Sequence, residues 1–466
     1  MSSGLINGAN IRNARRGFFL LLFIVALPAL MSCGESPSST GTPKPTTASD
    51  QATQADRATQ ALSSQPKVLT MATDYAYIQL RPDGNRYLEG QGNMPGTQPL
   101  DIKLSGVPQW LVAAPNGAGS LWVAVLEDGT TQAFQIEGGQ AVETAFSLRS
   151  LPAGAPPLLA VVGVQIDLLA CRSDMEARFS HPVPLGAPGR MAFIEVGGDL
   201  VVLQDGFEAG RLSVDALPDA RLLVDEQERV LLLTKPSTRY PHGIAGDELE
   251  ATEITLLETL PSLRVVRTIT IPGRRVVEGI SPIWADLNGD GQREIIVTLS
   301  DSDQGAQLVV YDGSGRQVAA GPAVGRGNRW RHQIAVAPFG INGEMELAEV
   351  LTPHIGGIAG FYRLEGDSLD LIIQTDGVTS HPLYSRNLDM GLAADLDGDG
   401  QPELVVFDQS FMEVKALRRT GDGVELAWQT PVGGKAVTNL AAVNTGGGIA
   451  LGVGREDGVL RIWPSP

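Results

Sequence analysis

The sequence predicts an all-β protein, and three observations support this prediction. The chain contains 55 glycines and 30 prolines, which are spread along its length and mark many turns. The apolar runs between these turns are four to seven residues long, a length that suits strands better than helices. From about residue 67 onward the runs recur in units of similar length, as in a domain built from repeats.

One repeat unit can be read directly from residues 283–319. Its four apolar segments are separated by an aspartate-rich loop, a polar gap and a D-G-S-G turn. The pattern returns in residues 391–428 and, in degenerate form, in residues 334–373 and 440–463. The glutamate that ends the aspartate-rich loop, or its equivalent, falls at positions 294, 346, 403 and 448, which gives spacings of 52, 57 and 45 residues.

A period near 50 residues with four strands per unit is typical of a β-propeller, whose blades bury their faces against one another in a closed ring. The 361 residues from Gly106 to Pro466 predict seven blades, or eight if residues 156–213 are split in two. The last unit supplies three strands, so we expect Pro99–Leu104 to add its fourth strand and close the ring. The alternative is that residues 67–105 form a separate small subdomain.

The N-terminus has the features of an export signal. Three arginines precede an apolar run of 13 residues at positions 18–30, which is short for a membrane span but normal for a signal peptide. The run ends in Leu30-Met31-Ser32-Cys33, which resembles the bacterial lipobox. That resemblance implies that Cys33 becomes the first residue and carries a lipid. An ordinary signal peptide with a chance cysteine, or an uncleaved anchor, is the alternative.

These features divide the chain into three parts. We expect a lipoprotein signal peptide at residues 1–32, then a lipidated Cys33 followed by a disordered Ser/Thr/Pro-rich tether to residue 66. The β-propeller then occupies residues 67–466. The mature protein is expected to be exported and anchored by lipid to the cell membrane or the outer membrane.

Charge and cysteine content limit the function classes. The formal net charge is −18, and removal of residues 1–32, which carry three arginines and no acid, makes it −21. So acidic a protein has no electrostatic reason to bind nucleic acid, whereas it can bind cations. If Cys33 carries lipid, Cys171 is the remaining thiol and no intramolecular disulfide can form. Its local sequence holds one arginine, so we expect Cys171 to be buried and structural rather than nucleophilic.

Two nine-residue segments, 286–294 and 395–403, share the form D-x-[D or N]-x-D-G-x-x-E. Alternate side chains in such a loop converge on one point, the glycine permits a sharp turn, and hard oxygen ligands favour calcium. An EF-hand is excluded because its twelfth position requires glutamate and is Val297 and Val406 here. The expected calcium ligands are Asp286, Asn288, Asp290, Glu294 and the carbonyl of Gln292 in the first loop, and Asp395, Asp397, Asp399, Glu403 and the carbonyl of Gln401 in the second.

The stretches A-D-L-N-G-D-G-Q-R-E-I-I-V and A-D-L-D-G-D-G-Q-P-E-L-V-V resemble the FG-GAP/VCBS repeats of integrin-α-type β-propellers. The resemblance is close over these two stretches, weak in the other C-terminal units and barely traceable before residue 270. It implies that the motif joins the innermost strand of a blade to the next strand, where calcium stiffens the blade. Pro338, Gly340 and Asn342 occupy the matching positions of the degenerate unit, and the last unit has lost the motif.

Aromatic and basic residues recur at places that a propeller would bring to one face. If the aspartate-rich loops lie at one end of the blades, the opposite end carries the segments that precede the innermost strands and the loops between second and third strands. Such residues suit contacts to sugars, carboxylates or an acidic peptide. The alternative is that each residue only caps its own blade. The candidate residues for this ligand face are Trp330, Arg331, His332, His354, His381, Tyr384 and Arg386.

Three functions fit this sequence. The first is a calcium-binding module for adhesion or binding in the cell envelope, with a glycan or protein ligand at the channel mouth. The second is a surface enzyme acting on polysaccharides, a lyase or hydrolase, which would require clustered and buried acids or bases in a deep pocket. The third is an assembly factor or periplasmic scaffold that uses the rim of its blades. No motif typical of a metalloprotease, serine hydrolase, dithiol or phosphate-binding loop is present, and no catalytic residue is predicted.

Overall fold

The computed structural model of the protein describes residues 75–146, 150–162, 165–171 and 175–465. All of them belong to one of the two units of the chain, which spans residues 62–466. They form strands joined by turns and loops, and no helix occurs among them. It follows that no described helix has the length and apolar character needed to cross a membrane. The expected all-β class is confirmed.

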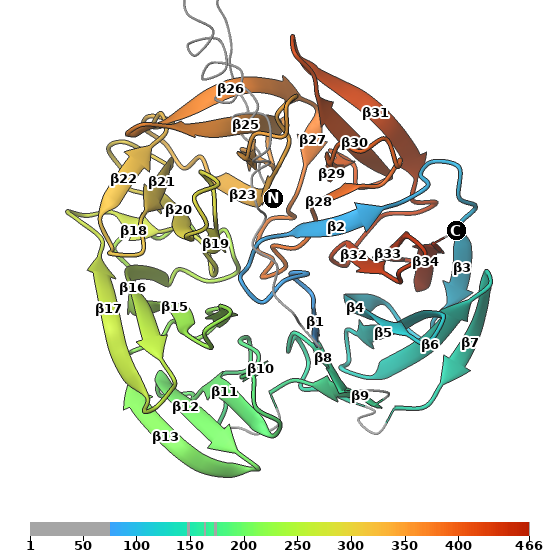
Figure 1. Ribbon diagram of the computed structural model, residues 1–466, viewed down its shortest axis with the longest axis horizontal. Helices are drawn as coiled ribbons and strands as arrows, with labels where there is room; N and C mark the ends of the chain where they lie inside the picture. The colour runs from blue at the N-terminus through green and yellow to red at the C-terminus, as the bar shows by residue number, and fades with distance from the viewer. Residues whose placement is uncertain (1–74, 147–149, 163–164, 172–174, 466) are drawn as a thin grey trace, which may run out of the picture. The chain divides into compact units, whose positions relative to one another are not determined.

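The antiparallel strand pairings of these residues define eight blades, which lie around a common centre (Figure 1). Blade 1 contains β4 (Pro108–Asn116), β5 (Gly119–Leu126), β6 (Thr131–Glu137) and β7 (Gln140–Thr144). Blade 2 contains β1 (Tyr75–Tyr77), β8 (Leu158–Val162) and β9 (Gln165–Leu169). Blade 3 contains β10 (Val183–Pro184), β11 (Arg190–Ile194), β12 (Asp199–Gln204) and β13 (Phe207–Ser213). Blade 4 contains β14 (Leu223–Val224), β15 (Val230–Ser237), β16 (Glu250–Glu258) and β17 (Arg264–Thr270).

The C-terminal half of the chain forms the other four blades. Blade 5 contains β19 (Ile283–Ala285), β20 (Glu294–Ser300), β21 (Gln307–Tyr311) and β22 (Gln317–Ala320). Blade 6 contains β23 (Arg331–Ala337), β24 (Glu346–Leu351), β25 (Ile358–Glu365) and β26 (Ser368–Asp376). Blade 7 contains β28 (Leu392–Asp395), β29 (Glu403–Asp408), β30 (Glu413–Arg419) and β31 (Val424–Pro431). Blade 8 contains β32 (Ala441–Asn444), β33 (Ile449–Arg455), β34 (Val459–Trp463) and β3 (Leu100–Lys103).

Four short pairings link neighbouring blades or lengthen one of them. The strand β18 (Val276–Val277) pairs with β16 of blade 4 and with β20 of blade 5. Blades 5 and 6 meet where β22 and β26 run parallel. The strand β27 (Val378–Thr379) pairs with β29 of blade 7.

The strand pairings resolve the choice between seven and eight blades. Residues 156–213 form two blades, because β8 pairs with β9 and with the distant β1, whereas β10 to β13 pair among themselves. The count within the described residues is therefore eight, the alternative that the sequence left open, rather than seven.

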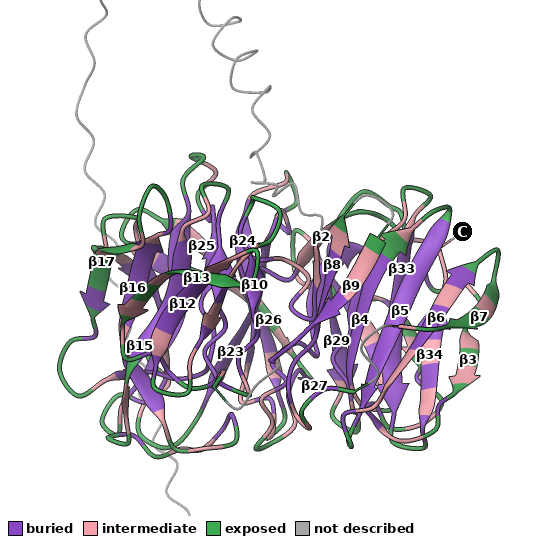
Figure 2. Ribbon diagram, turned by 90° about the horizontal axis from the view of Figure 1, so that it is seen from below, coloured by how far each residue is buried: buried purple, intermediate pink, exposed green. Residues whose placement is uncertain are grey.

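Burial follows the position of a strand within its blade (Figure 2). Every residue of β20 and β23, near the centre, is buried, whereas the outermost strands β13 and β17 are mostly exposed. Neighbouring blades therefore cover both faces of these inner strands, and even their polar residues, such as Arg331 and Gln333, are buried. The apolar clusters lie between adjacent blades; one cluster, for example, joins Ile334 and Phe361 of blade 6 to Leu404 and Val406 of blade 7.

The predicted closure of the ring is confirmed. The strand β3 pairs antiparallel with β34, with Leu100 opposite Ile462 and Asp101 opposite Arg461. Arg461 donates two hydrogen bonds to the Asp101 carboxylate, at 2.6 and 2.7 Å. Residues 100–103 therefore belong to the last blade and not to a separate subdomain.

A feature that the sequence did not predict is a segment at the centre of the ring, residues 82–86, which we call the central thread. Its backbone carbonyls accept hydrogen bonds from the innermost strands of three blades: Pro82 from Val224, Asp83 from Trp284 and Arg86 from Ala393. The Asn85 side chain bonds both backbone groups of Val336 in blade 6, at 2.8 and 2.9 Å. Four consecutive blades are thus tied to one stretch of chain, which continues into β2 (Tyr87–Gln91) beside β28.

Glycine at position 84 is required by this path. Its φ is +77°, and an added Cβ would lie 2.7 Å from the carbonyl oxygen of Pro282. A larger residue would be strained in this backbone conformation and would push the thread away from blade 5.

Candidate functional site

The two aspartate-rich loops adopt the same geometry. In each, the first aspartate accepts hydrogen bonds from the backbone of both glycines: Asp286 at 2.7 and 2.8 Å, and Asp395 at 2.8 and 2.9 Å. The final carboxylate, Glu294 or Glu403, accepts a bond of 2.8 Å from the residue after the first aspartate. The glycines at positions 289 and 398 have φ values of +77° and +78°, as the shared turn requires. Both loops join the innermost strand of their blade to the next strand, as the family resemblance implies.

The loop of blade 7 gathers the donor atoms that a hard cation needs. Carboxylate oxygens of Asp395, Asp397 and Glu403 lie within 4.8 Å of one another. Burial, together with the negative charges of Asp397 and Asp395, raises the pKa of Glu403 to about 8. Oxygen donors crowded in this way fit calcium. Asp399 turns aside and forms an ion pair with Arg418, which also lies 3.2 Å from Asp397.

The loop of blade 5 has the same backbone but fewer charges. Asn288 replaces an aspartate, and its amide donates bonds of 3.3 Å to Asp290 and to Glu294. Burial raises the pKa of Glu294 to about 7. The residues fit a cation with two buried carboxylates, Asp286 and Glu294, and the Asn288 carbonyl as donors.

Gln292 and Gln401 occupy equivalent exposed positions in the two loops. Each donates its backbone N–H to the aspartate two residues before it, Gln292 to Asp290 at 2.7 Å and Gln401 to Asp399 at 2.9 Å. These bonds hold the loop closed and orient that aspartate.

In the degenerate loop of blade 6, two arginines meet the buried glutamate. Glu346, the equivalent of Glu294 and Glu403, lies 2.6 Å from Arg363 and 3.4 Å from Arg419. Two guanidinium groups therefore neutralise this buried carboxylate. In the corresponding loop of blade 8, the Asn444 amide donates to the carbonyl of Glu89 at 2.9 Å. These contacts explain how the loops of blades 6 and 8 hold their shape without the full acidic set.

At the opposite end of the blades, four of the expected ligand-face residues come together. The Trp330 ring stacks on His332 with a centroid distance of 4.6 Å, and His381 meets it edge-on at 4.9 Å. His354 donates a hydrogen bond of 2.9 Å to His381, which in turn donates to the carbonyl of Ser385 at 2.7 Å. The tautomers follow, because a carbonyl can only accept.

This cluster is an interior one. Trp330, His332 and His381 are buried, with 2 %, 1 % and 0 % of their surface exposed, and His354 is half-buried. Burial lowers the pKa of His381 to about 3 and that of His354 to about 4, and it takes the pKa of His332 well below its ordinary value. The three imidazoles are therefore neutral at pH 7. The buried side chains of Trp330, His332 and His381 pack inside the protein, which agrees with the alternative that such residues cap their own blades.

Arg331 does not join the cluster. It points to the other side of β23, where it forms a buried ion pair with Glu349 and donates a bond of 2.8 Å to the Tyr362 hydroxyl. Arg331 is therefore a structural residue of blade 6, and its inclusion in the ligand face was wrong.

Tyr384 and Arg386 do reach the surface at this end. Tyr384 is 72 % exposed and has a φ of +63°, which is uncommon for an aromatic residue. Arg386 forms ion pairs with Asp219 at 2.9 Å and Asp247 at 2.5 Å, and its guanidinium lies 4.2 Å from the centre of the Phe179 ring.

A pocket of about 300 Å³ opens beside these two residues, and we call it the mouth pocket. Most of its wall comes from the first residues of β4, the innermost strand of blade 1, and from segments that precede the innermost strands of blades 3, 7 and 8. The aspartate-rich loops follow innermost strands instead, so they lie at the other end of the ring. The wall consists of Pro108, Gln109, Trp110, Glu127, Gly154, Phe179, Tyr384, Ser385, Arg386, Asn387 and Val437.

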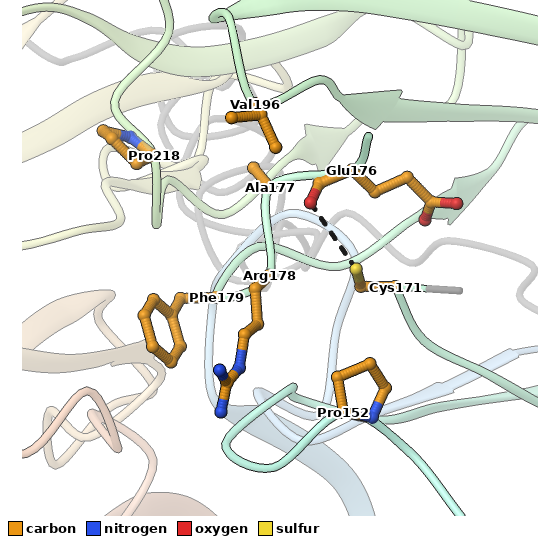
Figure 3. A pocket seen from close by; sticks show the side chains of 8 residues that line it. All are labelled: Pro152, Cys171, Glu176, Ala177, Arg178, Phe179, Val196 and Pro218. Carbon is orange, nitrogen blue, oxygen red and sulfur yellow. Dashed lines mark hydrogen bonds between the residues drawn. The ribbon is translucent and has the colours of Figure 1, made fainter. Parts of the chain in front are cut away.

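A neighbouring pocket of about 340 Å³ shares Phe179 (Figure 3). Its wall is largely apolar and includes Pro152, Val196 and Pro218. Cys171 lies on this wall, buried, with its sulfur 3.6 Å from the carbonyl oxygen of Glu176. The burial agrees with the structural role expected for this thiol.

Sequence reasoning missed Trp110, Phe179, Gln109 and Asn387 in the mouth pocket. Trp110 lies at the start of an innermost strand just as Trp330 does. The early repeats carry no aspartate-rich loop to mark where their innermost strands begin. The position of Trp110 at the start of such a strand could therefore not be recognised from the repeat pattern. The signal peptide, Cys33 and the tether lie outside the residues that the structure describes.

No family model and no curated protein matches this chain. Among solved structures, it is similar to a chain of the mitotic checkpoint complex, with 11 % identity over 80 % of this chain and 96 % of that one and a TM-score of 0.40. It is also similar to BamB from Moraxella catarrhalis, with 14 % identity over 78 % and 96 % and a TM-score of 0.36. The β-propeller domain of Cps50 (Swd1) from Myceliophteria thermophila matches with 10 % identity over 79 % and 98 % and a TM-score of 0.42.

Proposed function

We propose that this protein is an exported, lipid-anchored β-propeller that acts as a binding module of the cell envelope. Its ligand binds in the mouth pocket, while calcium in the loops of blades 5 and 7 stiffens the opposite end. Lipid on Cys33 and the tether that follows hold the propeller near a membrane. The lipobox-like sequence, the acidic net charge and the FG-GAP/VCBS-like loops support this assignment.

One observation carries the proposal: the concave, partly aromatic surface and the acidic loops lie at opposite ends of the ring, and blade 7 contributes to both. Asp395 and Glu403 flank one end of the innermost pair of strands in blade 7, whereas Tyr384 precedes that pair at the other end. A cation at the loops would therefore stiffen the end of the blade that lies away from the pocket. Calcium has no need to touch the ligand.

Binding fits the mouth pocket better than hydrolysis. Glycoside hydrolysis commonly uses two carboxyl groups on either side of the bond that breaks. Glu127 is the single carboxylate on the pocket wall among the residues described, and it is exposed. The buried acids Asp219, Glu250 and Glu278 are engaged with Arg386, the Gly279 amide and His242 respectively.

The proposal can be tested by placing a photo-crosslinking diazirine residue at position 384 in the full chain, in intact cells. The matched control places it at Leu426, which is 48 % exposed on the outer strand β31. We expect a specific adduct at position 384 and none at position 426. Equal labelling at both positions, or adducts at position 426 alone, would move the contact surface to the rim of the blades.

A further inference from the structure

The mouth pocket contains two amide groups with unused hydrogen-bonding atoms. Asn387 is 5 % exposed, and its Nδ2 has no hydrogen-bond partner. Its orientation is fixed, because its Oδ1 accepts the backbone N–H of Asp389 at 3.0 Å. On the same wall, the buried Oε1 of Gln109 has no partner either. A buried polar atom left without a partner destabilises the fold unless a ligand or water satisfies it.

The two atoms have complementary roles. Nδ2 of Asn387 is a donor and Oε1 of Gln109 is an acceptor, whereas a hydroxyl group both donates and accepts. A ligand with several hydroxyl groups can satisfy both atoms at once. A purely apolar ligand would leave them unsatisfied, and an anion would satisfy the donor alone.

Aromatic side chains border these amides. Tyr384 offers an exposed ring, and Phe179 is half-buried with one face against Arg386. Trp110 lies deeper and is held by its indole N–H, which donates to the carbonyl of Gly154 at 3.3 Å. Rings of this kind pack against the C–H face of a sugar ring, while the hydroxyl groups at its edge meet the amides.

The charges on the wall favour a neutral ligand. Arg386 is the one cation among the wall residues, and the carboxylates of Asp219 and Asp247 neutralise it. Glu127 adds a negative charge at the edge. A volume of about 300 Å³ lies at the small end of the range for ligand pockets and suits one or two sugar rings.

We infer that the mouth pocket binds a neutral saccharide, with Asn387 and Gln109 bonding its hydroxyl groups and Tyr384 stacking on a ring. This inference rests on the proposed function and specifies its ligand class.

The full chain, solubilised in detergent with calcium present, is tested on a printed array of neutral oligosaccharides that end in glucose, galactose, mannose or N-acetylglucosamine. Sialylated and uronic-acid oligosaccharides serve as anionic comparators. We expect binding to at least one neutral oligosaccharide. Calorimetry with that oligosaccharide then measures the affinity of each variant.

Tyr384→Ala and Gln109→Leu are each expected to weaken binding by roughly three- to tenfold, because each removes one stacking or hydrogen-bonding contact. Leu383→Ala is the matched control, since Leu383 is the adjacent residue, is 52 % exposed and does not line the pocket. Its affinity should equal that of the unmodified chain. Unchanged melting temperatures of the variants establish that the loss is local.

Two outcomes would overturn the inference. One is binding to anionic oligosaccharides alone or to none. The other is neutral-sugar binding that Tyr384→Ala and Gln109→Leu leave unchanged. The photo-crosslinking at position 384 separates this failure from failure of the proposed function. A protein adduct there would support a binding role for the pocket but would show that its ligand is a protein and not a saccharide.

Discussion

The contact between Trp122 of blade 1 and Gly452 of blade 8 gives a sharp prediction about ring closure. Trp122 is fully buried, and its indole N–H donates to the Ser120 hydroxyl at 2.8 Å. A Cβ added at Gly452 would lie 2.4 Å from Cζ3 of that indole, well inside the usual contact distance of about 3.5–4.0 Å. Gly452→Ala must therefore displace the Trp122 ring from a closely packed interface.

Overpacking of this kind costs about 1–3 kcal/mol of the free energy of unfolding. Trp122→Phe alone also destabilises, since it leaves a cavity and removes the bond to Ser120. In the double variant the smaller ring leaves room for the new methyl group. The combined loss should then be smaller than the sum of the two single losses by about 1 kcal/mol or more.

Urea-induced unfolding at a fixed calcium concentration measures these differences. Gly210→Ala is the control, because Gly210 lies in strand β13 and its added Cβ would meet Leu263 at an ordinary 3.4 Å. If Gly452→Ala costs no more than Gly210→Ala, or if the losses of Trp122→Phe and Gly452→Ala are additive, the two end blades do not pack as described.

Three further predictions follow from other parts of the chain. Cys33→Ser should move the protein from the membrane fraction to the soluble fraction, and continued fractionation with lipid would contradict lipidation. Arg418→Ala should tighten calcium binding by roughly three- to tenfold in a calorimetric titration, because calcium no longer competes with Arg418 for Asp397 and Asp399; equal or weaker affinity would contradict this. Burial lowers the pKa of His381 to about 3, so the unfolded chain takes up a proton below about pH 6.5 and the folded chain does not. Stability is therefore present above pH 6.5 and falls as the pH drops, by about 2 kcal/mol at pH 5. His381→Gln should lose correspondingly less between pH 7 and pH 5, and an identical loss would refute the assignment.

The sequence predicted the C-terminal blades well because their aspartate-rich loops mark the strand register. The unit expected at residues 283–319 is blade 5, whose strands begin at Ile283 and end at Ala320. The closing strand was also predictable, since a blade with three strands needs a fourth and residues 99–104 precede the first blade. The earlier blades lack such a marker, so the sequence of residues 156–213 is compatible with either one blade or two.

The central thread was not predictable from local sequence. Its residues hydrogen-bond partners far along the chain, such as Val336 for Asn85, and no periodicity records such contacts. The face of the strand to which a side chain points also decides which partners it meets. Arg331 and His332 are adjacent in sequence, but successive side chains on a strand point to opposite faces, so one pairs with Glu349 and the other joins the cluster.

The calcium dependence of crosslinking at position 384 tests the central claim most directly, that calcium and ligand act at opposite ends of the ring. Removing calcium by chelation, with its presence verified beforehand, should lower the melting temperature by several degrees, since a site saturated at 100 times its Kd contributes about 2.7 kcal/mol. At a temperature where the calcium-free protein is still folded, we expect the yield of the adduct at position 384 to stay the same. An adduct that disappears with calcium while the protein remains folded would show that the metal takes part in binding the ligand.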